Sequence, residues 1–236
     1  MKNLLEKLFP ICRSITGNGV RKSLDIIKEY TKTDLNIIEI PSGKKVYDWE
    51  IPKEWNINTA WVKDSNGNKI IDFDLNNLHL VSYSIPIDDY MSLDELKKHI
   101  HTIPDKPDWI PYRTSYYNED WGFCISHKHL EELEVFDGVS NSGEYHVYID
   151  STLEQGNLSY GELFLPGKSN EEILLSTYIC HPSMANDNLS GPVLLSELAK
   201  NLAKEDLHYS YRFLFIPETI GAIAWLSENE NKLNNI

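Results

Sequence analysis

The chain has 236 residues, of which 41% are hydrophobic and 25% charged, a composition typical of a folded globular protein. Its formal net charge of −14 argues against nucleic acid or a membrane as a partner, because nucleic acid and anionic lipid both require basic surface. No stretch approaches the ~18 apolar residues of a membrane span, and Glu6 and Lys7 interrupt any apolar signal-peptide core. Three cysteines without close spacing favour reduced thiols, so we expect a cytoplasmic protein.

Apolar residues recur at helical spacing and in short strand-like runs along both ends of the chain. The predicted helices are 19–32, 189–203 and one that begins at about residue 219. The predicted strands are 35–40, 144–150, 158–165, 173–180 and 209–216. Strands that alternate with helices predict an α/β fold with a mixed, partly parallel sheet flanked by helices.

The middle of the chain has a different composition, rich in tryptophan and tyrosine. Its tryptophans are Trp49, Trp55, Trp61, Trp109 and Trp121. Asn66-Gly67 lies between two apolar runs and predicts a hairpin, because both residues tolerate positive φ. We predict a β-rich domain at 46–130, inserted into an α/β domain made of 1–45 and 131–236. Its tryptophans either fill that domain, the more common role, or stack on sugar rings.

Three polar residues follow predicted strands and could carry chemistry. His181 directly follows the strand at 173–180, and Asp187 lies in the same loop before the next helix. Open α/β sheets bind ligands outside the carboxyl ends of their strands, and zinc prefers imidazole and carboxylate ligands. Glu218 follows the strand at 209–216, at the same edge of a parallel sheet, where a general base is needed.

The sequence therefore predicts a zinc hydrolase site with His181 and Asp187 as metal ligands and Glu218 as general base. Asp187 could instead be a helix N-cap, and Glu218 an ordinary first-turn helix carboxylate. Two protein ligands are fewer than the three of most catalytic zinc sites, so a further ligand is required.

Other polar residues have weaker patterns. Arg113, Tyr116 and Tyr117 are candidates to line a substrate cleft, with Arg113 holding a carboxylate by two hydrogen bonds, although core packing and a structural ion pair compete for this cluster. His99 with His101, and His127 with His129, would each share one side of a strand. Two histidines without a third ligand are more often surface residues, so these pairs are left out of the metal site.

Two segments near the candidate site, 185–191 (ANDNLSG) and 217–221 (PETIG), resemble the zinc-dependent aminopeptidase superfamily with the phosphorylase/hydrolase-like α/β fold. More narrowly, the chain resembles aminopeptidase-like proteins with an inserted domain of unknown function, found near polysaccharide-biosynthesis genes. The segments that carry this narrower resemblance are 46–56 (VYDWEIPKEWN), 108–117 (DWIPYRTSYY) and 121–124 (WGFC). The resemblance covers essentially the whole chain.

The resemblance implies a metal-dependent hydrolase of an amide or peptide bond, acting on a small-molecule or peptide-like substrate such as an amidated sugar or a modified amino acid. It also implies that His181 is a terminal zinc ligand, Asp187 the metal-bridging aspartate and Glu218 the general base. Thr219 stands where the superfamily has a second metal-binding glutamate, and Ser183 where it commonly has a supporting aspartate. We therefore expect one zinc ion rather than two.

The superfamily takes further aspartate and histidine ligands from later strands, yet residues 219–236 contain neither residue type. We expect this chain to be the N-terminal part of a longer protein and, alone, a poor enzyme. The competing interpretation is a non-catalytic binding module that retains the fold. A third is a subunit completed by another chain, and homo-oligomerisation is also left open.

Overall fold

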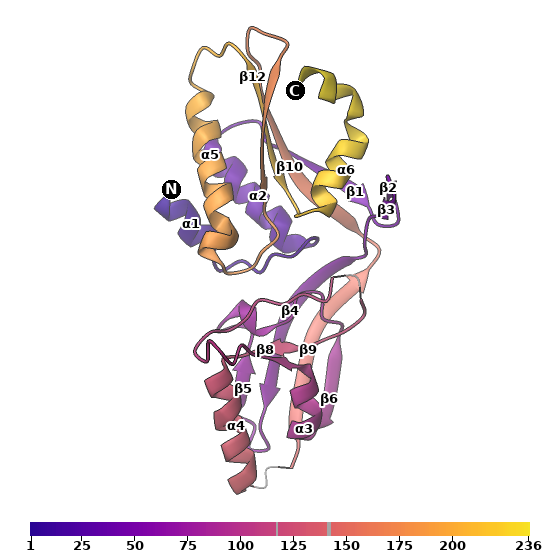
Figure 1. Cartoon of the computed structure of the whole chain (residues 1–236), viewed down its shortest axis with the longest axis vertical. Helices are drawn as coiled ribbons and strands as arrows, with labels where there is room; N and C mark the ends of the chain where they lie inside the picture. Colours follow the sequence, from indigo (N-terminus) through magenta and orange to yellow (C-terminus); the bar gives the residue numbers. More distant parts are fainter. Residues whose placement is uncertain (117, 141–142) are drawn as a thin grey trace. The chain divides into compact units, whose positions relative to one another are not determined.

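The computed structural model describes residues 1–116, 118–140 and 143–236. Helices and strands alternate along both ends of the chain, with mixed parallel and antiparallel pairing (Figure 1). The predicted α/β fold class is confirmed.

The described residues form two compact units. The first joins residues 1–54 to residues 154–236, and the second consists of residues 55–153. The second unit extends further along the chain than the insertion expected from composition, because it includes a long helix and a strand after residue 126. The assignment of domains from the sequence remains a prediction.

The first unit contains a four-stranded sheet in the order β1-β10-β12-β11. β1 (Asn36–Pro41) and β12 (Ser210–Ile216) both run antiparallel to β10 (Asn157–Leu165). β11 (Glu172–Tyr178) runs parallel to β12. The carboxyl ends of β11 and β12 therefore meet at one edge of the sheet, as the sequence predicts.

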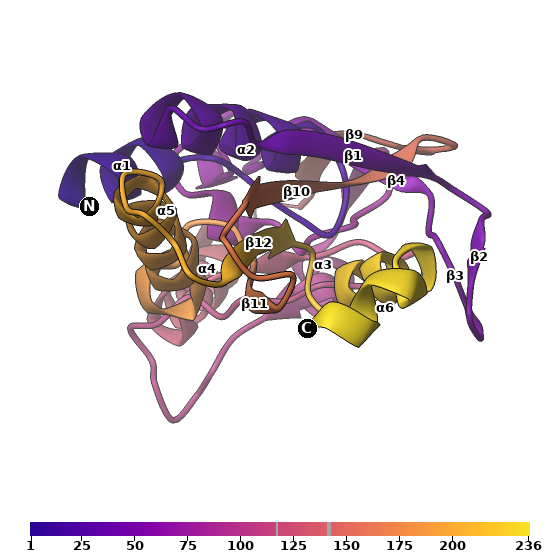
Figure 2. The same ribbon diagram turned by 90° about the horizontal axis from the view of Figure 1, so that it is seen from above.

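Three helices cover one face of this sheet. α2 (Asn18–Thr31) packs on β10 and on α5 (Ser190–Leu202), and α1 (Lys2–Leu8) packs on both helices. Figure 2 shows these helices on one side of the strands. Their apolar faces and the inward residues of β10 and β12 form a core. Its largest members include Leu4, Leu8, Leu24, Ile27, Leu163, Phe213 and Phe215.

One glycine brings α2 unusually close to the segment that follows α1. A Cβ atom at Gly19 would lie 1.9 Å from the backbone oxygen of Cys12, so a larger residue would displace the main chain. Gly19 therefore fixes the segment containing Cys12 and Arg13 against the start of α2.

The opposite face of the sheet carries a buried charged network. Because side chains alternate along a strand, Arg212 projects away from the face that holds Phe213. Arg212 Nη1 lies 2.5 Å from Glu162 Oε1, and its Nε lies 2.8 Å from Glu172 Oε2. Trp225 of α6 (Ile220–Glu228) donates a 2.6 Å hydrogen bond to Glu162 Oε2. α6 therefore packs on this second face (Figure 2).

The second unit contains a sheet in the order β5-β4-β9-β6. β4 (Glu54–Lys63) and β5 (Lys69–Asp72) are antiparallel, and Gly67 in their turn has a φ of 84°. Asp64 Oδ1 accepts hydrogen bonds from the backbone of Asn66 and Asn68 at 2.9 and 2.8 Å. The predicted hairpin at Asn66-Gly67 is confirmed.

The strand predicted at 144–150 as part of the α/β sheet belongs instead to the second unit. It forms β9 (Tyr145–Glu154), which pairs antiparallel with β6 (Ile87–Met91). Tyr145, Val147 and Ile149 are buried on alternate positions. That alternation predicts a strand with one buried face but does not specify the sheet to which it belongs.

The histidine pairs do not share strand faces. His127 and His129 lie in the first turn of α4 (His127–Ser140), where residues two apart point in different directions. His99 ends a 3₁₀ turn, and only His101 lies in a strand. The remaining short elements are β2 (Lys45–Val46), β3 (Trp49–Glu50), η1 (Asn77–His79), α3 (Leu93–Leu96), η2 (Lys97–His99), β7 (Ile100–His101), β8 (Phe123–Cys124), η3 (Ala185–Leu189) and η4 (Glu230–Asn235).

The tryptophans of the second unit differ in environment. Trp55 is 3% exposed and its Nε1 donates to the backbone oxygen of Ser84 at 2.9 Å, whereas Trp109 is 61% exposed. The ring of Trp61 stacks on Tyr148 at 5.0 Å and carries Lys63 Nζ at 4.1 Å. The ring of Trp61 therefore packs against other side chains of the protein.

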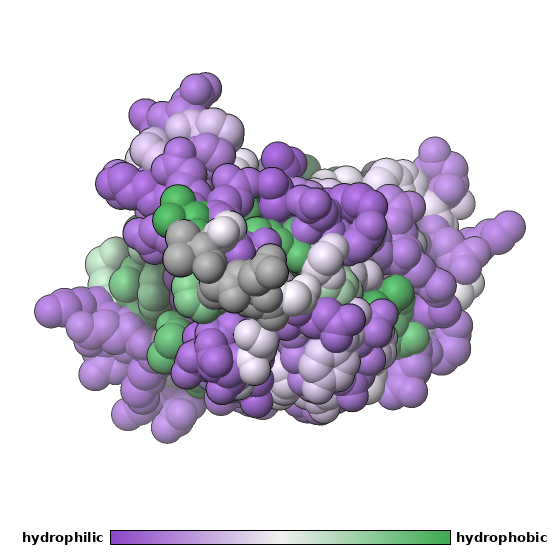
Figure 3. All heavy atoms as spheres, turned by 90° about the horizontal axis from the view of Figure 1, so that it is seen from below, coloured by the Kyte–Doolittle hydropathy of each residue, from purple (hydrophilic) through white to green (hydrophobic). Residues whose placement is uncertain are grey.

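The molecular surface is mostly hydrophilic on the one face shown. On the face drawn in Figure 3, apolar residues lie in small patches between hydrophilic ones. Among the described residues, no helix combines the length and the apolar character needed to cross a bilayer.

Candidate metal centre

The parallel pairing of β11 and β12 brings two candidate residues together. Tyr178 is the register partner of Ile216, and these residues end the two strands. His181 lies three residues after Tyr178, and Glu218 lies two residues after Ile216. The Glu218 backbone N–H also donates to Cys180 Sγ at 3.2 Å, which ties the two strand ends to each other.

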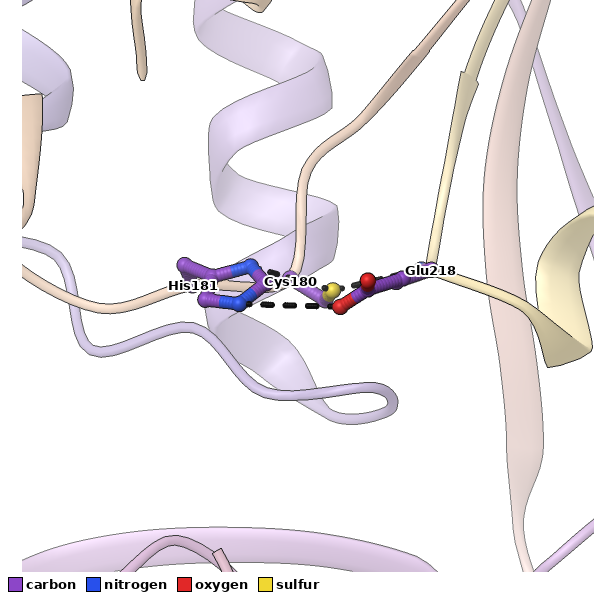
Figure 4. A group of neighbouring side chains, drawn as sticks. All are labelled: Cys180, His181 and Glu218. Atoms are coloured by element: carbon purple, nitrogen blue, oxygen red, sulfur yellow. Dashed lines mark hydrogen bonds and ion pairs between the residues drawn. The ribbon is translucent and has the colours of Figure 1, made fainter. Parts of the chain in front are cut away.

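The side chains of Cys180, His181 and Glu218 form a compact cluster. His181 Nε2 lies 3.6 Å from Glu218 Oε2, and Cys180 Sγ lies 3.6 Å from His181 Nδ1. Figure 4 shows the imidazole and the carboxylate directed toward each other with the thiol beside them. Within the described part of the chain, this is the one group of three such side chains whose ligand atoms all lie within 4.8 Å of one another.

Asp187 lies outside that cluster but close to it. Its Oδ1 accepts a 2.6 Å hydrogen bond from the Tyr178 hydroxyl, and its charge acts to raise the pKa of His181. The Tyr178 ring lies 5.1 Å from the imidazole of His181, between ring centroids. The sequence analysis did not identify Tyr178. Its place at the end of a strand, three residues before a candidate ligand, was the available signal.

The backbone of the His181 loop is held by the segment after α1. Arg13 Nε donates to the His181 backbone oxygen at 2.9 Å, and Arg13 Nη1 donates to Leu8 O at 2.5 Å. Ser183 Oγ donates to Phe9 O at 2.7 Å. Ser183 thus joins the loop to the N-terminal segment, a different contact from the supporting aspartate that the resemblance implies. Arg13 was also missed, because a contact across 168 residues leaves no local pattern.

Burial controls the protonation of the cluster. It lowers the pKa of His181, and the nearby charges of Asp187 and Glu218 offset only part of that effect. The imidazole is therefore held in its neutral, metal-binding form. Burial also raises the pKa of the Cys180 thiol to about 12. Because this thiol is protonated at neutral pH and is almost inaccessible, the cluster does not suit a cysteine nucleophile.

Imidazole and carboxylate are usual zinc ligand groups, and bonds of about 2.0–2.2 Å in a tetrahedral site separate N and O ligands by roughly 3.3–3.5 Å. The 3.6 Å between His181 Nε2 and Glu218 Oε2 is close to that separation. A zinc ion on His181 would therefore lie next to the Glu218 carboxylate, and the Asp187 carboxylate of the same loop is the second candidate ligand.

Comparison with known proteins places the chain in a family. Residues 2–236 match the family described as "Domain of unknown function (DUF4910)". The chain belongs to the DUF4910 family. It is also 57% identical, over 99% of its length, to a Clostridium acetobutylicum protein named "Putative polysaccharide biosynthesis protein with aminopeptidase-like domain". This DUF4910 chain spans 52% of the length of that relative.

Solved structures confirm the aminopeptidase-like fold. A crystal structure of a putative peptidase from Clostridium acetobutylicum has a TM-score of 0.94 at 57% identity, and the match covers 99% of this chain and 53% of that one. A zinc aminopeptidase from Bacillus subtilis has a TM-score of 0.59 at 13% identity, with 99% of this chain and 66% of that one covered. At that identity the second likeness shows the fold alone.

The substrate-binding candidates of the DUF4910 chain lie in the second unit. Arg113 and Tyr116 are exposed, and the backbone oxygen of Arg113 accepts a 3.0 Å hydrogen bond from Ser82 N. Tyr117 lies outside the described residues. A role for these three residues in substrate binding stays a prediction.

Acidification is expected to destabilise the protein below about pH 6.5. Burial lowers the pKa of His101, His129 and His181 from 6.5 in the folded state. Below that pH the unfolded chain binds more protons than the folded chain, so the free energy of unfolding falls as the pH falls. Urea unfolding at pH 8, 6.5 and 5 measures the effect. His129→Gln should reduce the dependence of the free energy of unfolding on pH, whereas His208→Gln, at an exposed position, should not. The same pH dependence in the wild type and both variants would contradict the role of His129.

Proposed function

We propose that the first unit carries the metal centre of an aminopeptidase-type hydrolase that cleaves an amide or peptide bond. The observation that carries this proposal is the 3.6 Å approach of His181 Nε2 to Glu218 Oε2 at the paired ends of β11 and β12. The aminopeptidase-like fold supports it, because ligands bind at that edge of α/β sheets. The whole protein's activity and substrate are proposals in the same sense, since the chain spans about half the length of its relatives.

In this proposal His181 and Asp187 would hold one zinc ion, which would polarise the substrate carbonyl and lower the pKa of water. Glu218 removes a proton from the attacking water and delivers it to the nitrogen of the leaving amine. A C–O bond thus forms and the C–N bond breaks without a net change in protons on the protein. The neutral imidazole of His181 keeps a lone pair available for the metal.

We propose an amidated sugar or a modified amino acid as the substrate, a choice that the relative's name, which refers to polysaccharide biosynthesis, supports. The alternative, a non-catalytic binding module, is favoured by Thr219, which replaces the expected second glutamate and provides no usual zinc ligand. Binding of such a ligand without its hydrolysis would support the alternative.

Metal content is the first test. The purified chain, loaded with zinc and then dialysed, is expected to hold about one zinc per chain by elemental analysis. Asp187→Asn and His181→Ala should each lose most of that zinc, because each removes one of only two proposed ligands. Asp25→Asn, at an exposed position on α2, is the matched control. A folded wild-type chain without zinc, or Asp187→Asn with full zinc, would overturn the proposed site.

A further inference from the structure

One side chain contacts both proposed metal ligands. Tyr178 ends β11, and its hydroxyl donates to Asp187 Oδ1 at 2.6 Å. Its ring lies 5.1 Å from the His181 imidazole, with an angle of 58° between the planes. Its backbone oxygen accepts a hydrogen bond from the Asn188 side chain. Tyr178 therefore holds the loop 181–188 at three points around the site.

The bond to Asp187 distinguishes the two oxygens of that carboxylate. Oδ1 is engaged by Tyr178, whereas Oδ2 has no hydrogen-bond partner among the described residues. A hydrogen bond from a fixed phenol restricts rotation of the carboxylate and leaves Oδ2 as the oxygen without a partner in the described part of the chain. Hydrogen bonds of this kind orient carboxylates that bind metal.

We propose that Tyr178 is a positioning residue that fixes the orientation of the Asp187 carboxylate and leaves Oδ2 available to the metal. This inference rests on the proposed function and adds the group that orients its aspartate ligand. The ring of Tyr178 also limits rotation of the His181 imidazole.

The variant Tyr178→Phe isolates the hydroxyl, because phenylalanine retains the ring beside His181. Zinc affinity, measured by competition with a chromogenic chelator, is expected to fall by about 10–100-fold, the usual cost of losing a group that orients a metal ligand. The visible absorption spectrum of the Co²⁺-loaded protein should change as well, because it reports the ligand geometry. Tyr211→Phe, in the neighbouring strand β12, is the matched control and should change neither property.

The outcomes separate this inference from the proposed function. Wild-type zinc affinity and an unchanged Co²⁺ spectrum in Tyr178→Phe would overturn the positioning role, even if the wild-type chain binds zinc. No zinc in a folded wild-type chain would overturn both. Zinc binding that weakens in Tyr178→Phe but not in Tyr211→Phe supports the inference.

Discussion

Replacing Glu218 with glutamine is expected to reduce zinc-dependent hydrolysis by about 10²–10⁴-fold while leaving zinc content near the wild-type level. Glutamine has the size of glutamate but cannot accept a proton from water at neutral pH. Glu218 is half-exposed, and its Oε2 lies 3.6 Å from His181 Nε2, so its carboxylate can reach both solvent and the metal position.

The measurement is kcat on a panel of chromogenic aminoacyl amides with the zinc-loaded protein. Glu171→Gln, an exposed residue just before β11, is the matched control and should retain wild-type activity. Equal activity in Glu218→Gln and wild type would rule out the general-base role. Joint loss of zinc and activity would instead identify Glu218 as a ligand, and no turnover by the zinc-loaded wild type would favour the binding module.

Replacing Arg212 with alanine is expected to lower the free energy of unfolding by about 3–5 kcal/mol, the usual effect of removing one partner of a buried ion pair. The Arg212 side chain is only 7% exposed and holds two carboxylates that are 14% and 9% exposed. It also lies 4.6 Å above the ring of Phe164. Without the guanidinium, Glu172 would lose this ion-pair partner, and among the described residues Glu162 would keep only Lys232, 3.3 Å away, and Trp225.

Urea unfolding at neutral pH measures this loss. Lys168→Ala, which breaks the exposed ion pair with Asp206, is the control and should have little effect, because exposed pairs contribute little. Glu172→Gln should recover part of the stability lost in Arg212→Ala, since it removes the buried charge that loses this partner. If Arg212→Ala lowers the free energy of unfolding no more than Lys168→Ala does, water replaces the contacts that Arg212 makes with the two carboxylates.

The sequence predicted the convergence of His181 and Glu218 because strand ends follow local rules and the alternation of strands with helices predicts parallel pairing. A residue just after a buried strand lies at the carboxyl edge of the sheet, and parallel pairing of β11 with β12 then brings two such residues together. The same local rules could not assign β9 to its sheet, since alternation identifies a buried face but not its partner.

The contacts that hold the site were outside the reach of sequence patterns for a different reason. Arg13 and His181 are 168 positions apart, and nothing near either residue indicates the other. Tyr178 is close to Asp187 in sequence, but its hydrogen bond depends on how the loop between them folds back on the strand end. Local patterns therefore identified the candidate site residues, while the residues that contact them required the tertiary structure.

The attachment of the His181 loop to the start of the chain has a thermodynamic consequence. Arg13 and Ser183 join that loop to the backbone of Leu8 and Phe9, so docking of α1 and ordering of the loop are coupled equilibria. By reciprocity, any ligand that binds the ordered loop also stabilises α1, and any change that releases α1 weakens that ligand by the same factor. Amide exchange in α1 is therefore expected to slow when a ligand binds the ordered loop.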